Sequence, residues 1–130
     1  MAQAAKWFKE CSENHEGCKA AFPKTIFVPT RLIEISGSDE ISLSICLRER
    51  KTLPPEVCYA TLSHCWGSTM PFMLKLEKLD SCLKSIPLSG LSKVFRDAIS
   101  FAWRLNIQYL WIDSLCNLQY RFAGADSQAN

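Results

Sequence analysis

Two short apolar runs, each ending in small or polar residues, dominate the second half of the sequence. They are Val57-Cys-Tyr-Ala-Thr-Leu-Ser63 and Tyr109-Leu-Trp-Ile-Asp113. Both have the length of a strand, and an apolar run of this kind is typical of a strand that is covered on both faces. Between them, residues 91–105 carry an apolar stripe at helical spacing, with Ser92 placed as an N-cap. This order predicts an α/β fold in which the two runs are neighbouring parallel strands.

The segments before and between these runs also have readable patterns. Residues 31–35 form one predicted strand, and residues 41–48 alternate apolar with polar side chains, which indicates a strand with one wet face. Ser36-Gly-Ser-Asp-Glu40 between them is typical of a turn, so we expect a β-hairpin. Residues 72–86 carry leucines at helical spacing and predict a helix that Pro87 ends.

A first helix is predicted over residues 3–22, and one of its faces carries Trp7, Cys11, His15 and Cys18. Spacings of four, four and three residues put these side chains on a single stripe. The Cys-x3-His-x2-Cys pattern resembles half of a zinc site, but a structural zinc needs four ligands and no second pair follows at short spacing. We therefore interpret the stripe as a face that packs on the sheet, and we predict no metal site and no cofactor.

Composition narrows the class of protein. The 130 residues suffice for one domain, and 48% hydrophobic with 22% charged residues is typical of a globular chain. A net charge of +2 is too small to indicate nucleic-acid binding. There is no apolar run of the roughly 18 residues that a membrane span needs, and the N-terminus lacks the apolar part of a secretory signal. The odd count of seven cysteines then predicts reduced thiols in the cytoplasm or nucleus, and we expect a cytoplasmic protein.

Several motifs resemble those of the fungal heterokaryon incompatibility (HET) domain family. Tyr59-Ala-Thr-Leu-Ser-His-Cys-Trp-Gly67 resembles a family strand that ends in Ser-(Tyr/His)-Cys-Trp-Gly. Tyr109-Leu-Trp-Ile-Asp-Ser-Leu-Cys116 resembles the second family signature almost residue for residue. Phe95-Arg-Asp-Ala-Ile99 is similar to the helix segment between them, and the leader with Pro29-Thr-Arg-Leu-Ile33 is similar to the region found before many HET domains.

The family pattern stops early in this sequence. The family continues after Cys116 with Ile-x-Gln-Asp and a further helix, whereas Asn117-Leu-Gln-Tyr-Arg121 departs from that pattern. We therefore interpret the chain as the N-terminal part of a HET domain that has been truncated. We expect residues 1–56 to form a helix and hairpin leader, residues 57–119 a partial HET domain, and residues 120–130 a disordered tail.

The resemblance also implies an architecture and a site. HET domains are similar to TIR domains, so the expected fold is an incomplete TIR-like parallel sheet flanked by helices, preceded by a helix and a β-hairpin. Ligands of open parallel sheets bind beyond the carboxyl ends of the strands. The predicted binding or structural site at those ends contains Ser63, His64, Cys65, Trp66, Gly67, Asp113 and Ser114.

Asp113 admits two interpretations. A carboxylate at the end of an apolar strand is costly to bury without a partner. We favour hydrogen bonds from the backbone amides of residues 63–67, and direct contact with a ligand or a partner is the alternative. Adjacent strand residues point to opposite faces, so neither a Ser63–His64–Asp113 triad nor a His64–Cys65 pair forms readily. No catalytic residue is predicted.

For function, the resemblance implies a signalling and interaction module in fungal non-self recognition and programmed cell death. A protein partner or self-association is expected, without nucleic acid or membrane. One alternative is a TIR-like NAD-cleaving enzyme, whose catalytic glutamate would lie beyond residue 119 and for which Glu56 and Glu77 are poor substitutes. Another is a remnant without function. Truncation would leave the Tyr109–Asp113 strand with an exposed edge, which predicts dimerisation or marginal folding.

Overall fold

A single mixed sheet forms the centre of the protein. The structure, a computed structural model, describes residues 2–20, 27–65 and 72–119. Within these ranges the strands are β1 (Arg31–Ser36), β2 (Ser44–Glu49), β3 (Tyr59–Leu62) and β4 (Tyr109–Ile112). They lie in the order β2-β1-β4-β3, where β1 is antiparallel to both β2 and β4, and β3 is parallel to β4. The predicted α/β class is confirmed, with a sheet that is mixed rather than parallel.

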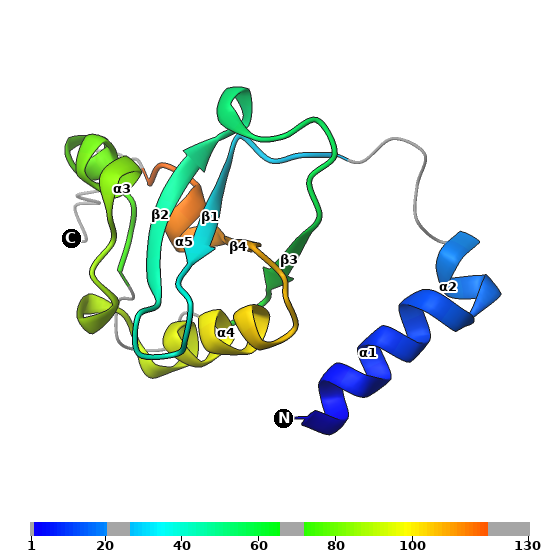
Figure 1. The fold of residues 1–130 in the computed structure, drawn as a ribbon. Helices are drawn as coiled ribbons and strands as arrows, with labels where there is room; N and C mark the ends of the chain where they lie inside the picture. The colour runs from blue at the N-terminus through cyan, green and yellow to red at the C-terminus, as the bar shows by residue number, and fades with distance from the viewer. Residues whose placement is uncertain (1, 21–26, 66–71, 120–130) are drawn as a thin grey trace, which may run out of the picture.

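The described helices lie before the sheet and on one of its faces. They are α1 (Ala2–Asn14), α2 (Glu16–Ala20), α3 (Leu79–Lys84), α4 (Lys93–Arg104) and α5 (Asp113–Cys116). Short 3-10 turns occur at Arg50–Thr52, Leu76–Lys78 and Leu88–Gly90. In Figure 1, α1 and α2 are set apart from the sheet, whereas α3, α4 and α5 lie beside it. Among the described helices, none has the length and apolar character that crossing a membrane requires.

The main core lies between the sheet and helices α3, α4 and α5. Ile33 and Leu47 from the hairpin are fully buried against Phe95 and Ile99 of α4 and Leu115 of α5, in one apolar cluster. Burying side chains of this size contributes about 1.5–3 kcal/mol each relative to leaving them exposed. A smaller cluster on the other face joins β1, β4 and the connector before β3. The hairpin and the segment from β3 to α5 therefore share both a sheet and a core.

The predicted hairpin forms, but its second strand starts later than expected. β2 begins at Ser44, and Ile41 is 99% exposed. The cause is the turn, because the Asp39 carboxylate accepts hydrogen bonds from the amides of Ile41 at 3.0 Å and Ser42 at 2.8 Å. Aspartate often fixes turns in this way. Gly37 adopts a φ of +139°, and a Cβ there would lie 2.9 Å from the Ser42 carbonyl oxygen.

The prediction that the Tyr109–Asp113 strand has an exposed edge is wrong. β4 has a hydrogen-bonded neighbour on each side, because β1 pairs with it antiparallel at Ile33↔Leu110. The hairpin thus occupies the edge that was expected to be open. Among the described strands, β2 and β3 lie at the two edges of the sheet. Thr61 of β3 is exposed, so the prediction that this strand is covered on both faces is wrong.

The helix expected over residues 72–86 is much shorter. It consists of the 3-10 turn and α3, and Leu76 is exposed. Residues before the turn are extended because their backbone groups bond to the chain that follows β4. The Leu74 amide donates to the Ser114 carbonyl at 2.7 Å, and the Leu74 carbonyl accepts from the Gln119 amide at 2.9 Å. Helical spacing of leucines did not reveal these long-range partners.

The leader also differs from expectation. The helix predicted over residues 3–22 is divided into α1 and α2 at His15, and residues 21 and 22 lie outside the described residues. α1 buries none of its residues, and Trp7 is 63% exposed, so the prediction that its stripe packs on the sheet is wrong. One face of the sheet is covered by α3, α4 and α5. The other face of the sheet carries the Glu34–Arg48 ion pair, with 2.9 Å between Oε2 of Glu34 and Nε of Arg48. A charged pair at this position does not favour the packing of an apolar helix on that face.

Candidate functional site

The carboxyl ends of β3 and β4 lie side by side. The parallel register runs from Tyr59↔Tyr109 to Leu62↔Ile112, so Ser63 and Asp113 leave the sheet at the same end. A pocket of about 340 Å³ opens there. We call it the strand-end pocket, and it is lined by Thr61, Leu62, Ser63, His64, Trp111 and Asp113. The predicted arrangement of two neighbouring parallel strands is confirmed.

The structure brings together only part of the predicted site. Ser63, His64 and Asp113 line the strand-end pocket. Cys65 is exposed beside it, and Ser114 is fully buried behind it. Trp66 and Gly67, which belong to the predicted site, lie outside the described residues, and so do residues 120–130, the predicted disordered tail.

His64 faces the helix rather than its neighbours in the chain. Its ring packs edge-on against Phe95 of α4, with ring centroids 4.8 Å apart and planes at 89°. Its Nε2 is buried and has no hydrogen-bond partner among the described residues. Side chains alternate along an extended segment, which turns Ser63 and His64 to opposite sides. A Ser63–His64–Asp113 triad is therefore not assembled in the described part of the chain.

Asp113 has a local hydrogen-bond partner, Asn117. Its Oδ1 accepts a hydrogen bond from Nδ2 of Asn117 at 2.7 Å, and its carbonyl accepts from the Asn117 amide at 3.0 Å. None of the amides of residues 63–65 donates to this carboxylate, which corrects the sequence-based interpretation for that part of the loop. The aspartate thus closes the single turn of α5, and its position at the N-terminal end of that turn suits a negative charge.

The remaining residues of α5 anchor it in the core. Ser114 is fully buried, and its Oγ has no hydrogen-bond partner among the described residues. Burial raises the pKa of Cys116 to about 12, so this thiol remains protonated at neutral pH. Nη1 of Arg31 donates to the Cys116 carbonyl at 3.3 Å and so binds the end of α5. Arg31 was missed because its approach depends on the antiparallel pairing of β1 with β4.

Three lining residues of the strand-end pocket, Thr61, Leu62 and Trp111, were also absent from the predicted site. Thr61 and Trp111 lie directly opposite each other in the parallel register. Thr61 lies two residues before Ser63, and Trp111 lies two residues before Asp113. Side chains two residues apart on a strand point to the same face, so the sequence alone indicated that these two residues line the site. The lining groups offer two hydroxyls, one carboxylate, an indole, a leucine side chain and an imidazole whose ring packs on Phe95. Such a set suits hydrogen bonding and aromatic contact with a partner more than nucleophilic chemistry.

A second hollow lies between the open edge of β3 and α4. Its volume is about 710 Å³, and most of its lining is apolar. We call it the α4 groove, and its residues include Ala60, Leu62, Val94, Ala98, Phe101 and Leu105. Val94 is 55% exposed and Phe101 is 42% exposed. Large apolar side chains that gather beside an unpaired strand edge are typical of an interaction surface.

The exposed side of α4 has a pattern of its own. Val94, Ala98, Phe101 and Leu105 follow one another at spacings of four, three and four residues. This is the spacing of a coiled-coil seam, and it is separate from the buried stripe of Phe95, Ile99 and Ala102. α4 therefore carries two apolar stripes, and the outer one keeps Val94 and Phe101 exposed while its Ala98 packs at the margin of the core.

Charged residues flank this outer stripe. Asp97 and Arg104 are seven residues apart, so they lie on the same side of α4, and both line the α4 groove. Asp97 pairs with Lys93 one turn earlier, and Arg104 pairs with Glu40 of the hairpin turn. Exposed pairs of this kind contribute little, typically about 0–1 kcal/mol, so either charge is free to choose another partner at low cost.

Comparison with known families gives one match. Residues 59–129 match the family described as Heterokaryon incompatibility protein (HET). The matched segment covers more than half of the 130 residues and contains β3, α4, β4 and α5, and it extends past residue 119. No curated protein and no solved structure matches the chain.

Proposed function

The chain belongs to the heterokaryon incompatibility (HET) family, and from this we propose that it is a signalling module that acts by self-association. Its setting would be fungal non-self recognition and programmed cell death, in the cytoplasm. The observation that carries the proposal is the α4 groove with the open edge of β3 beside it. The proposed activity is protein contact rather than chemistry on a small molecule.

The outer edge of β3, which pairs with no other strand among the described residues, supports the proposal. Edge strands offer rows of free backbone N–H and C=O groups, and proteins that remain monomeric usually protect them with charges, proline or a covering segment. β3 reads Tyr-Ala-Thr-Leu and contains none of these protective residues. An apolar groove next to such an edge gives a partner both backbone and side-chain contacts.

The partner that best fits this surface is a second copy of the chain. If the outer stripes of two α4 helices pack antiparallel about a twofold axis, Val94 of one copy lies near Leu105 of the other. The same arrangement brings Asp97 of each copy near Arg104 of its partner. The charges on this surface are therefore complementary to those of a second copy, as a twofold contact requires.

The strand-end pocket has a supporting role in this proposal. Asp113 closes the α5 turn, and Arg31 binds the end of that turn, so these contacts hold α5 against the sheet. The pocket lies at the end of the edge strand, which places its hydroxyls and carboxylate within reach of whatever pairs with β3. We infer that it adds polar contacts at the rim of the same interface.

The proposal is tested by expressing the chain in a fungal host and scoring cell death. Phe101→Glu adds a charge in the middle of the outer stripe, and we expect it to abolish the response. Leu76→Glu is the matched control, because Leu76 is 68% exposed and lies in the 3-10 turn before α3, outside the residues that line the groove. Equal responses from both variants would contradict the proposal, provided that their protein levels are equal.

The TIR-like alternative is tested separately. Among the described residues that line the strand-end pocket, the single carboxylate is Asp113, and no glutamate is present. We expect purified protein to release no nicotinamide from NAD above the rate of an Asp113→Asn variant. Turnover by the wild-type chain that this variant lacks would replace the proposed module with an enzyme.

A further inference from the structure

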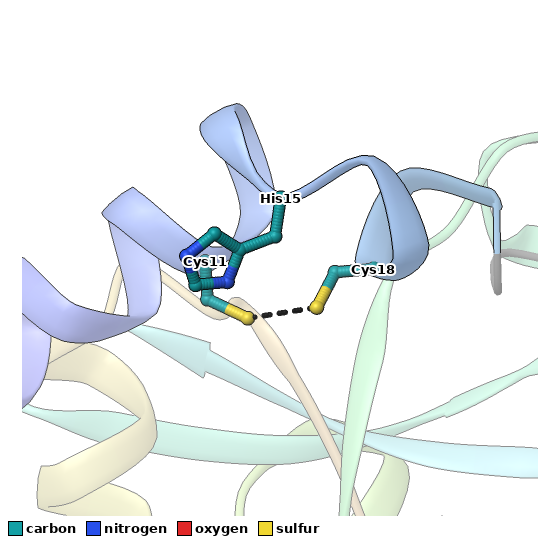
Figure 2. A group of neighbouring side chains, drawn as sticks. All are labelled: Cys11, His15 and Cys18. Carbon is teal, nitrogen blue, oxygen red and sulfur yellow. Dashed lines mark hydrogen bonds between the residues drawn. The ribbon is translucent and has the colours of Figure 1, made fainter.

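The helical leader brings together three side chains that can bind a metal. Cys11 lies in α1, Cys18 lies in α2, and His15 occupies the break between the two helices. The ligand atoms of all three lie within 4.8 Å of one another. Figure 2 shows the two thiols pointing toward each other, with the His15 imidazole on the same side. In the described part of the chain, this leader cluster is the one group of three or more such side chains.

We propose that the leader cluster binds one Zn²⁺ ion through two cysteine sulfurs and one imidazole nitrogen. Two thiolates and an imidazole are a ligand set that zinc accepts, and with three protein ligands the fourth position of the tetrahedron is left to water. This inference is independent of the proposed function, because the cluster lies outside the residues of the α4 groove.

The sulfur positions are close to those that zinc needs. The two Sγ atoms are 3.0 Å apart. Sulfurs bound to tetrahedral zinc at about 2.3 Å lie roughly 3.8 Å from each other, so binding requires them to separate by less than about 1 Å. Both thiols are half-buried, so their side chains have room to move. A rotation about χ1 of either cysteine can supply the required separation of the two sulfurs.

The backbone already directs the three ligands to one side. The His15 carbonyl accepts hydrogen bonds from the amides of Cys18 at 3.1 Å and Lys19 at 3.0 Å, and the His15 amide donates to the Cys11 carbonyl at 3.3 Å. These bonds continue the helical path through the break. Positions 11, 15 and 18 therefore stay on one stripe even though the helix is divided.

An apolar contact does not explain this stripe. α1 buries none of its residues, and α2 has only five residues. Isolated helices shorter than about 12–15 residues are marginal in water, so packing and propensity alone hold the pair weakly. A bound metal ion would stabilise the pair, because an ion that binds only the folded arrangement of its ligands adds its binding free energy to folding.

The first test is metal binding by the full, reduced and metal-free chain. Co²⁺ is the probe, because tetrahedral cobalt bound by thiolates gives sulfur-to-metal charge-transfer absorption. We expect this absorption to saturate at one equivalent and to disappear when Zn²⁺ is added. Cys11→Ser, Cys18→Ser and His15→Asn should each weaken binding at least tenfold. Cys58→Ser, which removes an exposed thiol outside the cluster, is the matched control and should bind like the wild type.

The second test needs no variant and so does not depend on their folding. Alkylation under reducing conditions is followed for each cysteine by mass spectrometry, with and without Zn²⁺. We expect zinc to slow modification of Cys11 and Cys18 at least tenfold and to leave exposed Cys58 unchanged. The proposal is overturned if the wild type shows no charge-transfer absorption, if the Cys11→Ser/Cys18→Ser double variant retains it, or if zinc protects all three thiols equally.

Discussion

At the scale of single residues, the turn that follows β4 depends on one side-chain pair. Asp113 accepts from the Asn117 side chain at 2.7 Å and from the Asn117 amide through its own carbonyl. The same carboxylate lies at the rim of the strand-end pocket. Its local partner explains how an acidic group is tolerated at the end of a buried strand, since polar groups in such positions need a hydrogen bond.

Replacing this carboxylate should cost little stability. We expect Asp113→Ala to lower the free energy of unfolding by about 0.5–1.5 kcal/mol, the usual net value of one hydrogen bond. Asn117→Ala should cost a similar amount, and the double variant should cost less than the two single changes added together. Urea denaturation gives the three values. Full additivity would show that the two side chains do not interact.

The buried thiol of Cys116 gives a prediction on pH. Burial raises its pKa from the ordinary value of 9.0 to about 12. Because the raised pKa means that the folded state keeps the proton longer than the unfolded state, stability is complete below pH 9 and falls as pH rises toward about 12. We expect Cys116→Ala to remove this part of the alkaline decline in melting temperature. An identical decline in the variant would contradict the assignment.

At the scale of elements, α4 shows the strongest link between sequence and structure. Ser92 precedes the helix, and its Oγ accepts from the Phe95 amide at 3.4 Å, as the sequence predicted. Asn106 follows it with a φ of 60°, a conformation that ends helices and that asparagine tolerates. Both signals are local, which is why they could be read without the fold.

The cap of α4 should be measurable. Ser92→Ala is expected to lower the free energy of unfolding by about 0.5–2 kcal/mol, because it leaves an amide of the first turn without its acceptor. Ser92→Asn keeps an acceptor at this position and should restore most of the loss. The check is thermal or urea unfolding of both variants. Equal losses of unfolding free energy in Ser92→Ala and Ser92→Asn would mean that the hydrogen bond of the cap contributes nothing.

Other elements could not be read in this way, because their partners are distant in the sequence. The leucines of residues 72–86 have helical spacing, yet Leu74 is extended because its backbone bonds to Ser114 and Gln119. The same holds for the edge of the sheet. Apolar strands can be found from the composition of short segments. Which strand lies in the centre of the sheet depends on the pairing of β1 with β4, and no local sequence pattern encodes that pairing.

At the scale of the whole molecule, the fold and part of the site were predictable. Two apolar runs around an amphipathic helix predicted parallel neighbours, and their carboxyl ends do meet, bringing Ser63 near Asp113. The α4 groove was not foreseen. The sequence contains its stripe at residues 94, 98, 101 and 105, but only the structure shows that Val94 and Phe101 of this stripe stay exposed.

Charge reversal tests the orientation of the proposed dimer. Asp97→Arg or Arg104→Asp alone should weaken self-association, because each places like charges opposite each other across the twofold axis. The double variant restores opposite charges and should recover most of the wild-type affinity. Dissociation constants from analytical ultracentrifugation at two salt concentrations give the comparison. If the α4 helices packed in parallel, the double variant would not recover the wild-type affinity, and the proposed antiparallel orientation would be contradicted.

Self-association through the α4 groove is tested most directly by the mass of the protein in solution. Sedimentation equilibrium should give a dimer for the wild type and for the control Leu76→Glu at micromolar concentration. Phe101→Glu should remain a folded monomer, with association at least tenfold weaker. A wild-type chain that stays monomeric across the concentration range, or a Phe101→Glu variant that dimerises as tightly as the wild type, would contradict the account.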